Sequence, residues 1–283
     1  MTDVNDRDKL YRTFETYRPE IVVHLAGINN VEVAETNCDE TVLVNVIGSR
    51  NVLECADRMG SARVILASSN RAADPASVVG CTKRIAELLA RQFDSGTTCA
   101  AAVRLGDVVE DRGSVIALFE RQIAMGGPIT IPHPDMMRCF LKATDAAQLL
   151  LSAAEMATAG RLYYLDSGDP VRVMSLAERL IHLSGLQPHR DVQIKVSGVR
   201  PGDKISETPI GQNESRVATS HPRIFEIRSE QPSEQGDLNM NLDKLERFAR
   251  DNDVPGMLRI MREMVPEFQP AQSPDKAGTT GTG

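Results

Sequence analysis

Short apolar, β-branched runs alternate with helical patterns through residues 1–110, and this alternation limits the possible folds more than any other feature of the chain. It is typical of βαβ units, in which each helix connects two parallel, buried strands. The expected strands cover 21–26, 63–67 and 99–103, and the expected helices cover 6–17, 41–59 and 77–93. The pattern predicts an α/β protein with a parallel sheet.

After Gly106 the pattern loosens, and we expect a smaller α/β substrate lobe with longer loops. Its expected helices cover 114–125, 144–156, 174–184 and 242–251, and its short strands lie near 129 and at 161–165 and 192–196. Residues 269–283 are mostly polar, Pro and Gly, which predicts a disordered tail. We therefore divide the chain into a Rossmann-like region 1–110, a lobe with carboxyl-terminal helices at 111–268, and the tail.

The composition excludes several classes of protein. A net charge of −7 argues against general binding to nucleic acid or anionic membranes. The five cysteines have no C-x-x-C spacing and the five histidines are scattered, so we expect reduced thiols and no metal site. No apolar run is long enough to span a membrane and the amino terminus is polar, which predicts a cytoplasmic protein.

The Gly-rich turn of a dinucleotide-binding fold is not found in the sequence. That turn precedes a helix whose amino terminus faces the pyrophosphate, but neither G-x-G-x-x-G nor G-x-x-G-x-x-G occurs here. We therefore predict a partial Rossmann-type sheet that lacks the first βαβ unit. In the strand order 3-2-1-4-5-6 the strand at 21–26 would be the fourth, with an open outer edge. Such an edge predicts a homo- or hetero-oligomer or a cover formed by further sequence outside this chain, unless the amino-terminal segment folds back over it.

A series of motifs, each weak alone, runs in a fixed order from residue 3 to residue 268. They include Asp3-Val4-x-Asp6-Arg7, Val23-His24-Leu25-Ala26, Asn45-Val46-x-Gly48, Gly80-x-Thr82-Lys83-Arg84, Val103-Arg104-x-Gly106, Gly126-Gly127-Pro128, His133-Pro134-Asp135-Met136, Arg200-Pro201-Gly202-Asp203 and Val265-Pro266-Glu267-Phe268. On these motifs the chain resembles the CapD-like nucleotide-sugar 4,6-dehydratases and epimerases of polysaccharide biosynthesis, a branch of the extended short-chain dehydrogenase/reductases.

The resemblance implies an activity and its ligands. Family members use bound NAD or NADP to oxidise the sugar 4-hydroxyl, eliminate water across the next two carbons and return the hydride to carbon 6. The implied substrate is a UDP-linked N-acetylhexosamine. The absence of the Gly-rich turn argues against dinucleotide binding by this chain alone.

Residues 68–72 stand at the family's catalytic segment, which usually reads Ser-Thr-Asp-Lys-Ala. This chain reads Ser-Ser-Asn-Arg-Ala, so the resemblance places Ser69, Asn70 and Arg71 at catalytic positions, the last two substituted. The amide of Asn70 cannot exchange protons, and Arg71 stays protonated at any working pH. We therefore expect that the acid–base pair needed for elimination has been replaced.

Three further residues match cofactor-side positions of the family. Lys83 matches the conserved lysine that binds the nicotinamide ribose and belongs to the catalytic set; Val79, four residues earlier, replaces a Tyr or Met. Asn45 matches a polar residue that ties its helix to the active site, and Asp3 matches a residue that contacts adenine. Lys83 could instead be a surface lysine, and Asn45 a residue making local backbone hydrogen bonds.

The substrate-side residues are better retained. Arg138 and Arg200 match arginines expected near the sugar-nucleotide diphosphate, where a planar guanidinium binds phosphate well. Glu207 matches a carboxylate expected near the ribose, and Asp107 replaces a usual Asn, adding negative charge beside a negative ligand. In residues 27–31, two Asn replace a Lys and a His that face the sugar. For each arginine, a solvated ion pair is the alternative.

Three hypotheses follow. The chain is a divergent dehydratase-like protein with little or no activity alone, a UDP-sugar-binding or regulatory subunit that pairs with an active homologue, or a fragment of an active NAD(P)-dependent dehydratase.

Overall fold

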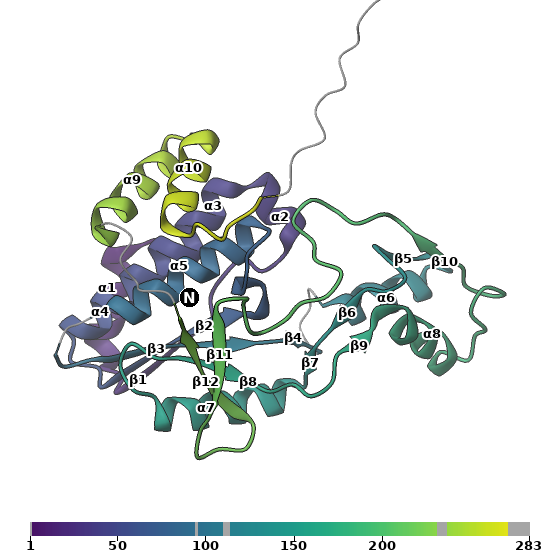
Figure 1. The fold of residues 1–283 in the computed structure, drawn as a ribbon, viewed down its shortest axis with the longest axis horizontal. Helices are drawn as coiled ribbons and strands as arrows, with labels where there is room; N and C mark the ends of the chain where they lie inside the picture. The colour runs from purple at the N-terminus through teal and green to yellow at the C-terminus, as the bar shows by residue number, and fades with distance from the viewer. Residues whose placement is uncertain (1, 94–95, 110–113, 231–236, 271–283) are drawn as a thin grey trace, which may run out of the picture.

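The computed structural model describes residues 2–93, 96–109, 114–230 and 237–270. Six strands form one sheet in the order β1–β2–β3–β8–β12–β11 (Figure 1). The neighbouring strands β1, β2, β3 and β8 are parallel to one another, and β12 is antiparallel to both of its neighbours. The strand bounds are β1 Ile21–His24, β2 Arg63–Ser69, β3 Cys99–Leu105, β8 Leu162–Leu165, β11 Glu214–Ala218 and β12 Ile224–Ser229.

Residues of β2 face both sides of the sheet, as expected for a buried parallel strand. Val64 and Leu66 pack with one group of helices (Figure 1), which comprises α1 (Arg7–Tyr17), α3 (Cys38–Val42), α4 (Gly48–Arg58), α5 (Val78–Gln92), α9 (Leu238–Arg250) and α10 (Val254–Met264). Ile65 packs on the opposite face with α7 (Ala143–Met156). The α/β class and the Rossmann-type parallel sheet predicted from the sequence are confirmed.

The lobe lies at one end of the sheet and has a core of its own (Figure 1). This core joins α6 (Val115–Ala124), α8 (Val173–Leu183), β5 (Ile129–Ile131) and β10 (Ile194–Val196). Two short strand pairs lead into it: β4 (Asp107–Val108) with β7 (Phe140–Leu141), and β6 (Met137–Arg138) with β9 (Val171–Arg172).

Several expected elements need correction. The helix expected over 41–59 consists of α3, a π-helical turn at Leu43–Ile47 and α4. Sequence reasoning missed α2 (Val31–Thr36), α10, β11 and β12. The sheet runs across the expected boundary at residue 110, because β8, β11 and β12 come from later in the chain. Most of the expected tail, residues 271–283, falls outside the described residues.

The edge strand β1 pairs with β2 alone among the described residues. Ile21 is 50% exposed at its start, and Leu25, just beyond its end, is 56% exposed. The open edge expected from strand order is therefore found. None of the described helices is long and apolar enough to cross a membrane.

Candidate functional site

A cleft of about 600 Å³ lies between the loops that follow β1, β2 and β3 and the lobe. Ligands of parallel α/β sheets bind at this end of the strands. Three predicted substrate-side residues line the cleft, namely Asp107, Arg138 and Arg200, together with Arg71 from the catalytic segment. Asn29 and Asn30 also line it, and Asn30 caps α2 by accepting a hydrogen bond from the Val33 amide.

Two departures from the family pattern meet in this cleft. Arg71 replaces a Lys and Asp107 replaces an Asn, and Arg71 Nη1 lies 3.1 Å from Asp107 Oδ1. Arg71 Nη2 also lies 3.1 Å from Glu207 Oε1, and Arg138 Nε lies 3.1 Å from the same oxygen. The negative charge that Asp107 adds is therefore neutralised by Arg71. Asp107 does not present an unpaired carboxylate to a ligand in the cleft.

The four groups alternate in charge and are largely buried. Burial raises the pKa of Glu207, and Asp107 raises it further, whereas Arg71 and Arg138 act in the opposite direction. Burial disfavours a charged Arg71, but Glu207 and Asp107 outweigh this and raise its pKa. Arg71 is thus a fixed cation held by two carboxylates, which cannot serve as a general acid or base.

The other positions of the catalytic segment, and position 79 on α5, offer no acid or base. Ser69 Oγ accepts a hydrogen bond from the Arg71 amide at 3.3 Å and caps the 3-10 turn at Asn70–Ala72. Asn70 is buried, and its Oδ1 has no hydrogen-bond partner among the described residues. Val79 is fully buried in α5.

Lys83 and Asn45 lie together behind Gly27, at the end of β1. A Cβ placed on Gly27 would be 2.8 Å from Lys83 Nζ and 3.0 Å from Asn45 Oδ1, so a larger residue here would require the Lys83 ammonium to shift. Asn45 exchanges hydrogen bonds with the backbone of Ile28 at 2.7 and 2.9 Å and donates another to Thr82 Oγ1. Lys83 Nζ donates to the Ala67 carbonyl at 3.2 Å. Lys83 is therefore not a surface residue.

Burial shifts the pKa values of two side chains near Gly27, Lys83 and His24. It lowers the pKa of Lys83 to about 8, with Glu87 acting in the opposite direction. Burial and the Lys83 ammonium lower the pKa of His24 to about 4, and His24 Nε2 has no hydrogen-bond partner among the described residues. His24 was not predicted to lie in this group, and only its place in a motif before the Gly27 loop could have indicated its position beside Lys83.

The described residues do not by themselves fit an intact dinucleotide. Lys83 and Asn45, which were expected on the nicotinamide side, lie together behind Gly27 and do not line the cleft. No Gly-rich turn that could hold a pyrophosphate lies beside β1 within the described residues. The expected adenine residue Asp3 is exposed and accepts a hydrogen bond from the Asn5 amide.

At the mouth of the cleft, Arg200 forms an exposed ion pair with Glu32 of α2. Glu32 and Asp203 line the cleft but were not predicted from the sequence. Glu207 is not among the lining residues, because its carboxylate is turned to Arg71 and Arg138. The cleft thus holds arginines and competing carboxylates.

The comparisons with known proteins agree with this architecture. Residues 1–229 match the family described as "Polysaccharide biosynthesis protein". The chain belongs to this family. The resemblance to polysaccharide biosynthesis proteins that was drawn from its motifs is therefore confirmed.

Two relatives carry closely related sequences. The chain is 40% identical over 225 residues to the probable polysaccharide biosynthesis protein EpsC of Bacillus subtilis. It is 36% identical over 227 residues to the capsular polysaccharide biosynthesis protein CapD of Staphylococcus aureus. These matches cover 79% and 80% of this chain, but the chain spans 38% of the length of each relative.

Solved structures share the fold. Pen from Bacillus thuringiensis has a TM-score of 0.73 at 29% identity, over 81% of this chain and 71% of Pen. DesIV, a dTDP-glucose 4,6-dehydratase from Streptomyces venezuelae with NAD and TYD bound, has a TM-score of 0.66 at 19% identity, over 74% and 70%. At that identity the second likeness concerns the fold alone.

Proposed function

We propose that this chain binds a nucleotide sugar in the cleft but does not carry out dehydration alone. One observation carries the proposal. Arg71 stands at the family's acid–base position and is held in ion pairs with Asp107 and Glu207, each at 3.1 Å. Elimination needs a group that takes one proton and a group that gives one. Asn70, Arg71 and Val79 supply neither, whereas the binding arginines remain.

The proposed binding mode follows from the two cleft arginines. Arg200 is half-exposed, and its partner Glu32 is 63% exposed, so the pair is weak and a diphosphate can replace Glu32. Arg138 is buried and fixed by Glu207 and by the Met137 carbonyl, so it presents a positioned charge. The ligand class, a UDP-linked amino sugar, comes from the family; UDP-glucose 4-epimerase of Rickettsia akari is 30% identical over 224 residues.

Calorimetric titration tests this function. We expect UDP and UDP-N-acetylglucosamine to bind, and NAD(H) and NADP(H) not to bind, because no described turn holds a pyrophosphate. Arg200→Gln should weaken UDP binding, whereas Arg190→Gln should leave it unchanged, because Arg190 lies away from the cleft. Turnover of UDP-N-acetylglucosamine without a second protein, or dinucleotide binding at micromolar concentrations, would instead support an active dehydratase.

The open sheet edge favours a second candidate, a subunit that pairs with an active homologue. The half-exposed Ile21 and Leu25 flank the edge of β1 that pairs with no strand in the described part of the chain. An apolar parallel edge is stabilised when another strand pairs with it. Sedimentation of the chain with and without a full-length homologue tests this candidate. A monomer that does not bind the homologue would rule it out.

A further inference from the structure

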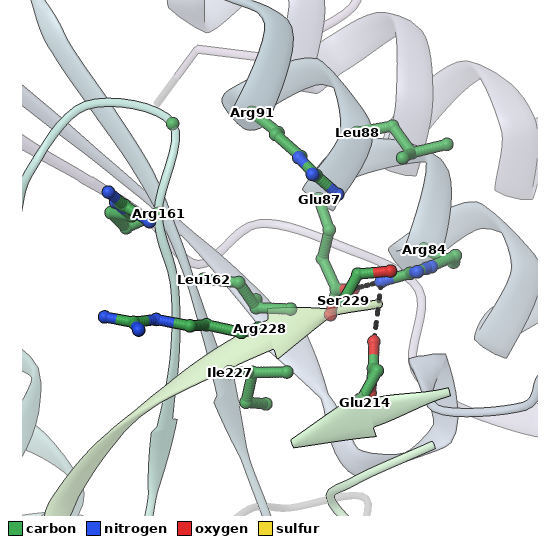
Figure 2. A pocket seen from close by; sticks show the side chains of 11 residues that line it. Arg84, Glu87, Leu88, Arg91, Arg161, Leu162, Glu214, Ile227, Arg228 and Ser229 are labelled. Carbon is green, nitrogen blue, oxygen red and sulfur yellow. Dashed lines mark hydrogen bonds and ion pairs between the residues drawn. The ribbon is translucent and has the colours of Figure 1, made fainter. Parts of the chain in front are cut away.

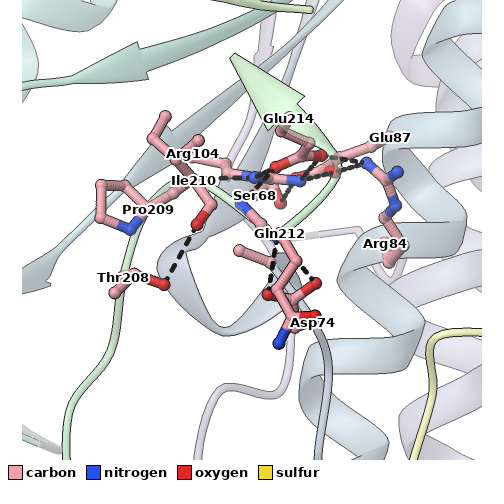
Figure 3. Close-up of polar contacts among 12 residues, drawn as sticks. Ser68, Asp74, Arg84, Glu87, Arg104, Thr208, Pro209, Ile210, Gln212 and Glu214 are labelled. Carbon is pink, nitrogen blue, oxygen red and sulfur yellow. Dashed lines mark hydrogen bonds and ion pairs between the residues drawn. The ribbon is translucent and has the colours of Figure 1, made fainter. Parts of the chain in front are cut away.

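Arg104 uses every N–H of its guanidinium in one buried network (Figure 3). Its Nε and Nη2 donate to the two oxygens of Glu87, each at 2.7 Å. Its Nη1 and Nη2 donate to the two oxygens of Glu214 at 2.6 and 3.0 Å, and Nη1 also donates to the Pro209 carbonyl at 2.8 Å. Arg104 therefore has a forked contact with each carboxylate, a geometry that lysine cannot reproduce.

Figures 2 and 3 show that the network continues to Arg84 on α5. Arg84 Nη1 lies 3.0 Å from both Glu87 and Glu214, and Arg84 Nε lies 3.1 Å from Glu267 after α10. A cavity of about 200 Å³ borders the network beside Arg84, Glu87 and Glu214. The network thus joins β3, α5, the start of β11 and the carboxyl-terminal segment.

The same network holds the loop that reaches the cleft. Pro209 is two residues from Glu207, whose carboxylate orients Arg71 and Arg138. At the other end of the loop, Glu214 accepts a hydrogen bond from the Gly211 amide at 2.8 Å. The loop from 207 to 214 is therefore attached to Arg104 at Pro209 and at Glu214.

We propose that Arg104, through Glu214 and Pro209, is a positioning residue that sets Glu207 and hence the cleft arginines. The inference rests on the proposed nucleotide-sugar binding. Buried ion networks are often no more stabilising than apolar packing, so stability alone is a weak reason for one. What this network provides is a fixed geometry for a loop without regular secondary structure between Glu207 and Glu214.

Glu214→Gln and Glu267→Gln form a matched pair for the test. Each removes one carboxylate paired with Arg84, but only Glu214 also contacts Arg104 and the loop. The first readout is amide hydrogen exchange, which needs no ligand. Glu214→Gln should accelerate exchange at Gly211 by roughly tenfold, corresponding to about 1.4 kcal/mol, and Glu267→Gln should not.

The second readout is UDP affinity. In the native chain, Glu214→Gln should weaken UDP binding several-fold, and Glu267→Gln should leave UDP affinity unchanged. In a chain that already carries Glu207→Gln, adding Glu214→Gln should not weaken UDP binding further. Equal exchange at the loop amides in both variants, or additive effects of the Glu214 and Glu207 substitutions, would overturn the proposal. If the native chain binds no UDP, the proposed function fails, and the exchange data still decide whether the network at Glu214 holds the loop.

Discussion

Lys83 offers a direct test of the buried group behind Gly27. Burial lowers its pKa from the ordinary 10.5 to about 8, and this difference corresponds to about 3 kcal/mol at roughly 1.4 kcal/mol per pKa unit. The charged lysine therefore destabilises the fold at neutral pH. Lys83→Met removes this cost and loses the hydrogen bond to the Ala67 carbonyl, worth about 1 kcal/mol. We expect a net gain of about 2 kcal/mol at pH 7.

The pH dependence gives the sign of the effect. Between pH 8 and 10.5 the unfolded chain binds a proton at Lys83 that the folded chain does not, so native stability rises with pH in this window. The gain in the free energy of unfolding from Lys83→Met should therefore be greatest below pH 8 and should shrink toward pH 10.5. Urea unfolding at several pH values measures this gain, with Lys195→Met as the control because Lys195 is exposed. A destabilised Lys83→Met at pH 7, or a pH-independent difference, would refute the argument.

Two further substitutions test the ends of the cleft. Glu32→Gln frees Arg200 from its exposed ion pair, so UDP should bind about two- to fivefold more tightly at low salt, and calorimetry at two salt concentrations measures this. Gly27→Ala places a Cβ 2.8 Å from Lys83 Nζ and should cost about 1 to 3 kcal/mol in urea unfolding; an unchanged midpoint would show that the lysine moves aside.

The regular α/β elements could be predicted from the sequence because their periodicity is local. The missed elements depend on other information. In β11 the sequence Glu-Ser-Arg-Val-Ala is largely polar, and its strand forms by pairing with β12 at the sheet edge. In α10 a Pro-Gly pair stands in the first turn, where Asp253 caps the helix by accepting from the Gly256 amide. Such a pair elsewhere indicates a turn.

The structure brings together several residues that the sequence singled out, but their pairings could not be predicted. The motifs identified Arg71, Asp107, Arg138 and Glu207, yet which charges meet depends on loops that follow different strands. The Arg104 network was missed for the same reason, because Arg104 and Glu214 are 110 residues apart. A buried arginine inside an apolar strand was the available signal, since it requires a carboxylate partner.

The Arg71 and Asp107 departures are best understood as one change. With Asn at 107, Arg71 would keep Glu207 as its remaining carboxylate partner, and Lys at 71 could not form the fork that spans both carboxylates. We therefore expect Arg71→Lys and Asp107→Asn each to destabilise the fold, and the double variant to recover about 1 to 2 kcal/mol relative to their sum. Urea unfolding of the four proteins measures this coupling. Additivity within about 0.3 kcal/mol would show that the two residues are independent, and the view of this cleft as a charge-balanced binding surface without acid–base chemistry would lose its main support.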